Sequence, residues 1–244
     1  MQKVCLIIPC YNESKRLNEK VFSDFIQLNN GISFCFVDDG SKDGTLDILN
    51  SIKSKYERIM VLRLDKNSGK AEAVRKGVLH VLELNLFDFI GYWDADVSTP
   101  LEESKHLLES FLKNNNITFV LGSRMKRLGS TIDRKKMRHI TGRIFSTFSS
   151  IILKLPVYDS QCGAKIFRAE ISSILFNEPF ITKWLFDVEL LARLRNHLGD
   201  KKILDVCYEV PLKSWGEVGG SKLRFSHLLK VPFDLIKIYF HYNK

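Results

Sequence analysis

The sequence lacks paired cysteines and long apolar runs. Its five cysteines are scattered, with no C-x-x-C pair and no spacing typical of zinc. We therefore expect reduced, mostly buried thiols in a cytosolic setting. No window reaches the ~18 uninterrupted apolar residues that span a bilayer. The apolar run at residues 4–9 is too short for a signal peptide and no cleavage site follows it, so we expect a chain that does not cross a membrane.

Two common nucleotide-binding loops are also missing. G-x-G-x-x-G is absent, and the segment ending at Gly69 and Lys70 does not complete G-x-x-x-x-G-K-[ST], because Ala71 follows the lysine and no glycine lies five residues before Gly69. Nucleotide binding through either loop is disfavoured. A helix that starts at Gly69 would still offer free N–H groups and a lysine to a diphosphate.

The positive charge of the chain is concentrated in one region. The 244 residues carry a net charge of +9, and between Ser123 and Leu155 nine Lys or Arg stand against one acid. A local excess of this kind indicates a partner with phosphates: nucleic acid, an anionic membrane or a phosphorylated substrate. Nucleic acid is disfavoured, because no aromatic positions interleave with the basic ones and no known binding motif is present.

Strand-like and helical patterns alternate along the first ~120 residues, which predicts an α/β fold with a mostly parallel sheet and helices on both faces. The expected strands are Val4–Pro9, Ser33–Asp38, Ile59–Leu64, Phe89–Asp94 and Thr118–Leu121, and the expected helices are Leu17–Leu28, Thr45–Tyr56, Lys70–Leu82 and Pro100–Leu112. Later, we expect helices at Met137–Leu153, Asp187–Arg195 and Leu223–Tyr242, the last kinked or interrupted at Pro232, and a strand at Ile203–Val210. Because 45% of residues are hydrophobic, the chain has enough apolar side chains for a core.

Two carboxylates, Asp94 and Asp96, directly follow a buried strand. In an extended strand, residues two apart point to the same side, so the pair would converge at the carboxyl end of the sheet. Ligands bind at that edge of open α/β sheets. Two hard oxygen ligands there suit Mg²⁺ or Mn²⁺, which takes water and substrate phosphates in its other positions. The alternative is a solvated turn.

Polar residues also follow the three earlier strands, which together describes a cleft. They lie in the segments Pro9–Glu13, Asp38–Thr45 and Asn67–Lys70. Asp38 and Asp39 are candidates to accept hydrogen bonds from the imide of a base or from ribose hydroxyls. The alternative is an Asx-type turn with Gly40, followed by a helix cap, a role that we assign to Asp43.

These residues, in this order, resemble the family 2 inverting glycosyltransferases with a GT-A fold, in the branch that loads a sugar onto a polyprenyl phosphate. The resemblance covers nearly the whole chain and is carried by the segments Pro9–Glu13, Val37–Ser41, Asn67–Lys70, Ala73–Gly77, Asp94–Asp96, Gly122–Arg124, Asp159–Phe167, Phe186–Leu191 and Trp215–Lys222. D-S-Q-C-G-x-K-x-F and F-D-V-E-L-L are the most specific. The resemblance implies one continuous domain, with a donor half at 1–122 and an acceptor half with basic amphipathic helices at 123–244.

The resemblance implies a nucleoside-diphosphate sugar donor, with UDP-glucose first and GDP-mannose or other UDP-sugars behind it. The residues implied in donor binding are Pro9, Tyr11, Glu13, Asp38, Asp39, Lys70, Asp94, Ala95, Gln161, Trp215 and Lys222. Asp96, together with Asp94, would hold the metal. Asp159 would close over the donor with Gln161, Trp215 and Lys222. For Trp215 and Phe167, ordinary core packing is the alternative.

The acceptor determines whether the reaction needs a base. A phosphate monoester is already ionised at neutral pH, so it needs positive charge to place it rather than a base. By resemblance, Arg124 and Arg138 are the phosphate clamps, since arginine binds phosphate oxygens bidentately. Asp187 lies where relatives that act on hydroxyls keep their base, and we expect a positioning role for it.

A polyprenyl or dolichyl phosphate acceptor lies in a bilayer, which implies a peripheral enzyme on the cytosolic membrane face. Met137–Leu153 and Leu223–Tyr242 combine basic and apolar residues as interfacial helices do; the alternatives are core packing and, for the second, oligomer contact. Competing functions are a GT-A glycosyltransferase acting on a saccharide hydroxyl, and a basic nucleic-acid or membrane-binding protein without catalysis. The intact Asp39, Asp94 and Asp96 argue against a catalytically dead relative.

Overall fold

The protein was analysed as a computed structural model that describes residues 2–219 and 225–242. The chain folds as two compact units, each made of two separate stretches: a first unit of residues 1–97 and 163–179, and a second unit of residues 98–162 and 180–244. Neither unit begins or ends at residue 122. The division into a donor half and an acceptor half at that residue is functional, and it stays a prediction.

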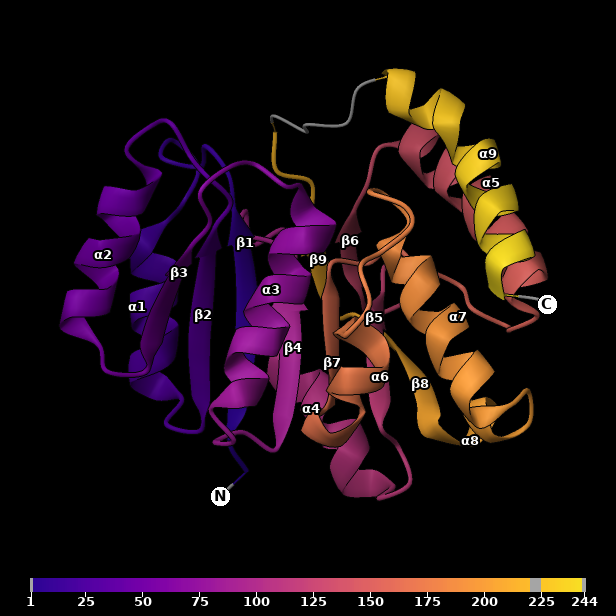
Figure 1. Cartoon of the computed structure of the whole chain (residues 1–244), viewed down its shortest axis with the longest axis horizontal. Helices are drawn as coiled ribbons and strands as arrows, with labels where there is room; N and C mark the ends of the chain where they lie inside the picture. Colours follow the sequence, from indigo (N-terminus) through magenta and orange to yellow (C-terminus); the bar gives the residue numbers. More distant parts are fainter. Residues whose placement is uncertain (1, 220–224, 243–244) are drawn as a thin grey trace. The chain divides into compact units, whose positions relative to one another are not determined.

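The first unit is built on a mostly parallel sheet (Figure 1). Its strands, in spatial order, are β3 (Ile59–Arg63), β2 (Ile32–Asp38), β1 (Val4–Cys10), β4 (Phe89–Trp93) and β7 (Ala164–Arg168). The first four are parallel, as predicted, and β7 runs antiparallel to β4. Strand β7 was not expected; it begins inside the D-S-Q-C-G-x-K-x-F segment, ends one residue after it, and pairs with β4, the strand that precedes the acidic pair.

Helices cover both faces of this sheet. They are α1 (Glu19–Leu28), α2 (Thr45–Lys55), α3 (Lys70–Glu83), the short 3₁₀ helix η1 (Ala169–Ile171) and α6 (Ser172–Phe176). The ring of Phe22 in α1 lies 5.4 Å from Phe34 and 5.0 Å from Phe36 of β2. Val37 points to the other side of β2, where Gly77 of α3 lies against it. The predicted two-sided α/β arrangement is confirmed.

The second unit contains two pairs of parallel strands and the remaining helices. Strand β5 (Phe119–Ser123) pairs with β8 (Cys207–Pro211), and β6 (Thr131–Asp133) pairs with β9 (Ser214–Gly216). The helices are α4 (Glu103–Lys113), α5 (Lys136–Leu153), α7 (Phe186–Leu198), α8 (Lys202–Val206) and α9 (Phe225–Tyr242). Helices α5, α7 and α9 pack against one another (Figure 1).

One prediction for this unit is wrong in part, and one of two predicted alternatives is excluded. The strand predicted at 203–210 begins only at Cys207, because Ile203 and Val206 are buried at helical spacing while Leu204 between them is exposed. Helix α9 is not interrupted at Pro232, which lies inside it. In the part of the chain that the structure covers, no helix combines the length and apolar character needed to cross a bilayer.

Candidate active site

The acidic pair lies in a turn that follows β4. The strand ends at Trp93, and the N–H of Val97 donates to the carbonyl of Asp94 at 3.1 Å, with Val97 at a φ of 53°. The prediction assumed that both aspartates lie in an extended strand and so point to the same side. They lie in the turn after the strand, so that assumption is wrong. The turn itself leaves Asp94 and Asp96 half-buried at the carboxyl end of the sheet in the first unit.

Asp94 is held on both sides. Its Oδ1 lies 2.5 Å from Nζ of Lys70, the first residue of α3. Its backbone N–H donates to the carbonyl of Gly163 at 3.2 Å. A Cβ on residue 163 would lie only 1.9 Å from Oδ2 of Asp94. Glycine at the end of D-S-Q-C-G is therefore what allows β7 to approach the carboxylate this closely.

Arg16 also belongs to this site, and the sequence analysis missed it. Its Nε and Nη2 donate to the two oxygens of the buried Glu13, at 2.8 and 2.7 Å. The hydrogen bond with Glu13 raises the pKa of Arg16, burial acts against this, and the charges of Asp96 and Asp94 add to the rise. Glu13, predicted to hold the nucleoside, thus holds Arg16 beside the acidic pair. The signal was available as an i, i+3 pair of opposite charges in N-E-S-K-R.

Asp39 anchors the start of α3. Its two carboxylate oxygens accept the backbone N–H groups of Ser68 and Gly69 at 2.7 and 2.8 Å. Burial raises the pKa of Asp39, and these two hydrogen bonds partly offset the rise. The residue predicted to bind the nucleoside therefore fixes the loop that carries Lys70.

Asp38 keeps a buried acceptor at the same edge. Its Oδ1 accepts the N–H of Ser41 at 3.2 Å, which is the Asx-type turn considered above. Its Oδ2 is buried and has no hydrogen-bond partner among the described residues. The N-cap residue of α2 is Gly44, so the predicted N-cap at Asp43 is wrong by one position. Asp43 instead accepts the N–H of Thr45, the first residue of α2, at 3.0 Å. Burial acts to raise the pKa of Asp43, but hydrogen bonds from Thr45 and Ser14 outweigh it and lower the pKa to about 2.

In the second unit, Arg124 forms a bidentate ion pair with the buried Asp159. Its Nε and Nη2 lie 2.7 Å from the two carboxylate oxygens, and its backbone N–H donates to the same carboxylate at 3.0 Å. Burial acts to raise the pKa of Asp159, but the charge and hydrogen bonds of Arg124 lower it overall. The guanidinium carbon also lies 5.5 Å from the centre of the Trp215 ring.

Two further carboxylates hold the loops around this pair, and neither was singled out from the sequence. Glu209 of β8 accepts the backbone N–H groups of Tyr158 and Asp159 at 2.8 and 2.7 Å. Glu103 of α4 accepts those of Lys213 and Ser214, beside Trp215, at 3.0 and 2.8 Å. An acid inside the apolar run of β8 was the available signal, because a buried carboxylate needs partners.

Comparison with known proteins identifies the family. Residues 5–176 match the model of glycosyl transferase family 2. The chain belongs to this family. It is 31% identical to a dolichyl-phosphate beta-glucosyltransferase of Trichomonas vaginalis, over 97% of this chain and 71% of that protein. It is 29% identical to the Saccharomyces cerevisiae protein of the same name, over 96% of this chain and 73% of that one.

Solved structures place the family 2 chain in the GT-A fold. Glucosyl-3-phosphoglycerate synthase from Mycobacterium tuberculosis, crystallised with Mn²⁺ and UDP-glucose, superposes with a TM-score of 0.68 at 18% identity, covering 97% of this chain and 77% of that one. The same enzyme in complex with UDP gives a TM-score of 0.69. The predicted fold and family are confirmed.

The remaining predicted residues of this glycosyltransferase are distributed over both units. Pro9 and Tyr11 are half-buried at the end of β1, and Ala95 is buried between the two acids. Asp187 is buried in the first turn of α7. The amide nitrogen of Gln161 is buried and lacks a hydrogen-bond partner within the described part of the chain. Asp187 and Gln161 belong to the second unit.

Two predicted residues cannot be placed, and two aromatic ones can. Arg138 belongs to α5, but its side chain is not among those described, and Lys222 lies outside the described residues. Phe167 is fully buried with its ring 5.3 Å from Phe176, which is the core alternative. Trp215 is also mostly buried, against Arg124.

Proposed function

We propose that this chain transfers a glucosyl residue from UDP-glucose to a polyprenyl or dolichyl phosphate, with inversion at the anomeric carbon. The bond from that carbon to the UDP oxygen breaks, a bond to the acceptor phosphate oxygen forms, and UDP leaves. The observation that carries the proposal is the half-buried pair Asp94 and Asp96 at the carboxyl end of β4, beside Lys70. The relatives named above support the choice of sugar and acceptor.

The first unit offers complementary groups to a nucleoside diphosphate. The buried Oδ2 of Asp38 is an acceptor without a partner in the described residues, so it suits the imide of a base or a ribose hydroxyl. On the neighbouring strand β1, Asp38 pairs with Cys10, which Pro9 precedes and Tyr11 follows in the chain. Lys70 at the start of α3 brings a cation and the positive end of a helix to the diphosphate.

The acidic pair fits Mg²⁺ or Mn²⁺. In the part of the chain that is described, no group of three or more His, Cys, Asp or Glu is present, so the protein would supply the two carboxylates alone. That suits a hard cation whose other ligands are water and the donor's phosphate oxygens. When bound, the metal would neutralise charge on the departing diphosphate. Because Asp94 already pairs with Lys70, we assign the metal chiefly to Asp96 and the donor contact to Asp94.

The acceptor phosphate needs cations rather than a base. Arg124 presents its Nε and Nη2 to Asp159, so we assign it a fixed positive charge on the acceptor side instead of a bidentate clamp. Arg138 from α5 is proposed to share that role. Asp187 is proposed to position the acceptor, since an ionised phosphate has no proton to lose at neutral pH. Such an acceptor would bring the chain to the cytosolic face of a membrane.

A donor panel tests the function. UDP-glucose, other UDP-sugars and GDP-mannose are supplied with Mg²⁺ or Mn²⁺, with and without a polyprenyl phosphate, and the released nucleotide and glycosylated lipid are measured. We expect lipid-dependent turnover with UDP-glucose, loss of turnover in Asp96→Asn, and retained turnover in Asp187→Asn. Transfer of glucose to free sugars but not to the lipid phosphate would overturn the proposed identity of the acceptor. Complete loss in Asp187→Asn with donor affinity kept would overturn the base-free mechanism.

A further inference from the structure

Helix α5 exposes an apolar stripe along its whole length. Its exposed hydrophobic residues follow one another at helical spacing: Met137, Ile140, Ile144, Phe148 and Ile151. They are between 53% and 71% exposed, although residues of these types usually lie in a core. The opposite side of the helix, with Ser146, Ser149 and Leu153, is buried in the second unit. An ordinary surface helix keeps its large apolar side chains on the buried side, whereas α5 exposes five of them and buries two serines beside Leu153.

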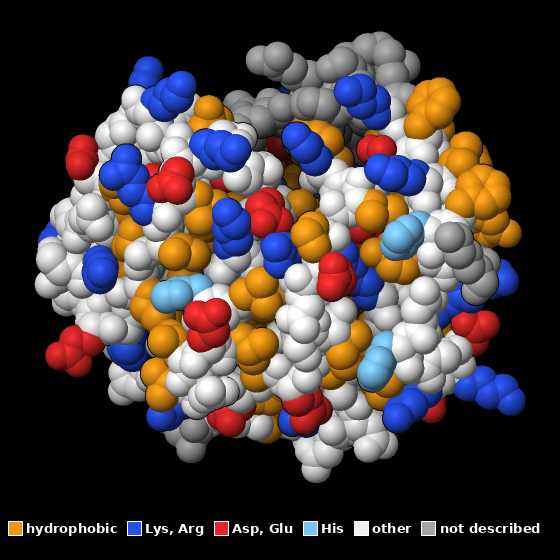
Figure 2. Space-filling view, in the orientation of Figure 1, with side chains coloured by type: hydrophobic (Ala, Val, Ile, Leu, Met, Phe, Trp, Pro, Cys, Tyr) orange, Lys and Arg blue, Asp and Glu red, His pale blue; other side chains and the backbone are white. Residues whose placement is uncertain are grey.

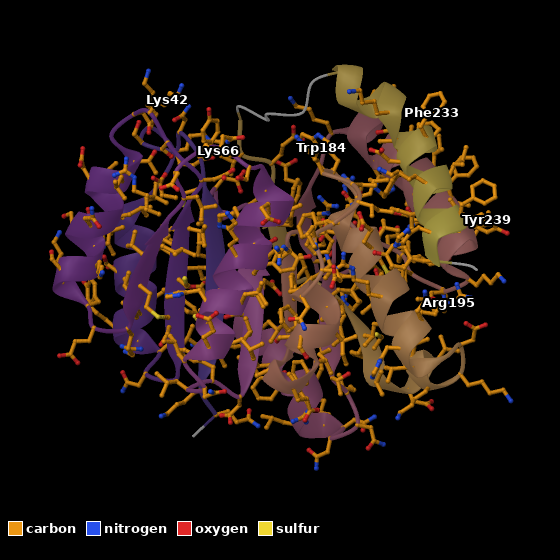
Figure 3. The ribbon with its side chains drawn as sticks, in the orientation of Figure 1. Lys42, Lys66, Trp184, Arg195, Phe233 and Tyr239 are labelled. Atoms are coloured by element: carbon orange, nitrogen blue, oxygen red, sulfur yellow. The ribbon has the colours of Figure 1, made fainter. Side chains whose placement is uncertain are left out.

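Helix α9 carries a second stripe of the same kind. Phe233, Ile236, Tyr239 and Phe240 are exposed, with Phe233 at 74% and Phe240 at 68%, while Leu235 and Ile238 on the other side are buried. Figure 3 shows Phe233 and Tyr239 pointing away from the ribbon. In Figure 2 the hydrophobic side chains over α9 gather at the right edge of the molecule. Since α5 and α9 pack side by side in one unit, the two stripes belong to neighbouring helices (Figure 1).

Helix α9 is fixed to the unit by polar contacts, two of them partly buried. The hydroxyl of Tyr242 lies 3.3 Å from Oε2 of Glu189 in α7 and accepts from Nε of Arg193 at 3.1 Å. Lys237 donates to the carbonyl of Ile181 at 3.1 Å. Glu189 is completely buried. The outward stripe of α9 is therefore presented by an anchored helix, so the apolar surface exists before any partner binds.

The charge of the two helices selects the partner. Helix α5 contains no Asp or Glu, and α9 contains one, Asp234. The exposed lysines near the stripes include Lys135, Lys154 and Lys230. A second copy of this chain would bring the same positive charge to the contact, which would oppose association. An anionic bilayer offers the opposite charge together with an apolar interior.

We propose that the exposed stripes of α5 and α9 form one docking face for an anionic lipid bilayer. Phe148, Ile144 and Phe240 enter the boundary between headgroups and acyl chains, and the flanking lysines contact the headgroups. No residue of the face belongs to the acidic pair or to the Arg124–Asp159 pair. The inference rests on the proposed function only for its purpose, which is to bring the enzyme to a phosphorylated lipid.

Cosedimentation with vesicles of phosphatidylcholine and phosphatidylglycerol tests the docking face. The double variant Phe148→Gln/Phe240→Gln is compared with Leu28→Gln/Leu112→Gln, which removes two exposed leucines, at 82% and 66%, from α1 and α4. We expect the first variant to bind vesicles about tenfold more weakly than the parent protein and the second to bind within about twofold of it. Because all four side chains are exposed, both variants should fold, which circular dichroism checks. Binding of the parent should fall with added salt and with pure phosphatidylcholine.

The outcomes separate this inference from the proposed function. Equal vesicle binding by the parent and Phe148→Gln/Phe240→Gln would overturn the docking face. Sedimentation equilibrium gives a second test. If the parent is a dimer and this variant is a monomer, the face binds a second copy of the chain, and the proposal of membrane docking is overturned as well. Turnover is also measured with a short, water-soluble polyprenyl phosphate and no vesicles, where the variant should match the parent. A parent that binds vesicles but never glycosylates that acceptor would leave the docking face standing and overturn the function.

Discussion

At the scale of single residues, buried and half-buried carboxylates hold backbone segments by accepting pairs of backbone N–H groups. Asp39 holds Ser68 and Gly69, Glu209 holds Tyr158 and Asp159, and Glu103 holds Lys213 and Ser214. A buried carboxylate is costly unless its oxygens are satisfied, and a pair of N–H groups satisfies it while fixing a loop. Asp39, which the sequence suggested for nucleoside binding, therefore also holds the loop before α3.

Replacing Gly163 by alanine should displace Asp94. The new Cβ would lie 1.9 Å from Oδ2, so either the carboxylate or the start of β7 must move. Because a displacement of about 1 Å at a reacting centre costs about 100-fold in rate, we expect a loss of that order in turnover with UDP-glucose. Gly216→Ala is the control, since a Cβ there meets nothing within 4 Å. Full activity in Gly163→Ala would show that Asp94 does not act in the site.

Replacing Asp159 by asparagine should destabilise the fold in a pH-dependent way. Removing one partner of a buried ion pair costs about 3 kcal/mol at neutral pH. Because the pKa of Asp159 is lowered in the folded state, its contribution is complete above the unfolded pKa of about 4 and is lost as the pH falls further. Urea unfolding should therefore show the parent and variant converging below pH about 4.

Asp24→Asn is the matched control for that measurement. Asp24 pairs with Lys20 on the surface, where both side chains are more than half exposed. An exposed pair contributes less than about 1 kcal/mol, so this variant should unfold close to the parent at every pH. If Asp159→Asn gave the same stability difference from the parent at pH 7 and at pH 3, the ion pair with Arg124 would not be what lowers the pKa.

At the scale of elements, helix α3 connects the core of the first unit to its site. Its first residue, Lys70, pairs with Asp94, and its middle packs on the sheet through Gly77. A Cβ at residue 77 would lie 2.5 Å from Ile7 and 2.7 Å from Val37, in β1 and β2. Because residue 77 has no side chain, α3 lies close to the strands. This close packing determines where Lys70, at the start of the helix, lies relative to Asp94.

Gly77→Ala should push α3 away from the sheet. We expect a loss of about 2 kcal/mol in the free energy of unfolding, because the gain in helix propensity does not offset overpacking against two strands. Turnover should fall as well, since Lys70 moves with the helix. Adding Ile7→Ala removes one of the two obstructing methyl groups, so the double variant should be more stable than the sum of the single changes predicts. Strict additivity in denaturant unfolding would contradict this packing.

At the scale of the whole molecule, the two units are interleaved in sequence. The first unit takes residues 163–179 from the middle of the chain, and with them β7 and Gly163. A site residue and the carboxylate that it accommodates are thus 69 positions apart, Gly163 against Asp94. Truncation at residue 122 would remove β7 from the sheet of the first unit, so the proposed donor half does not correspond to a separable piece.

The thiols report on the integrity of this fold. None of the five cysteines is in a disulfide, and four of them are buried. Burial raises the pKa of Cys35 and of Cys207 to about 12. Because the thiolate is the reactive species, a disulfide reagent at pH 8 should label the native protein slowly and label all five thiols in urea. Rapid labelling of several thiols without denaturant would show that the core is open.

The sequence predicted elements better than contacts. The first four strands and helices were placed to within about three residues, because their apolar periodicity depends only on local burial. It missed β7, whose antiparallel pairing with β4 is a long-range choice that a short apolar run does not reveal. The sequence correctly placed Asp94 and Asp96 at the end of β4. It predicted that they continue the strand, whereas the chain makes a turn there.

By itself, the sequence determined the family, the α/β fold and the identity of the residues at the strand ends, since these follow from periodicity and from motifs carried in short segments. Only the tertiary structure decided what those residues contact. Glu13 forms an ion pair with Arg16, and Asp159 forms one with Arg124. Asp39 accepts a backbone hydrogen bond from the loop before α3. The physical reason is that a buried charge takes whichever partner the packed chain brings within reach, and for Arg124 that partner lies 35 residues away.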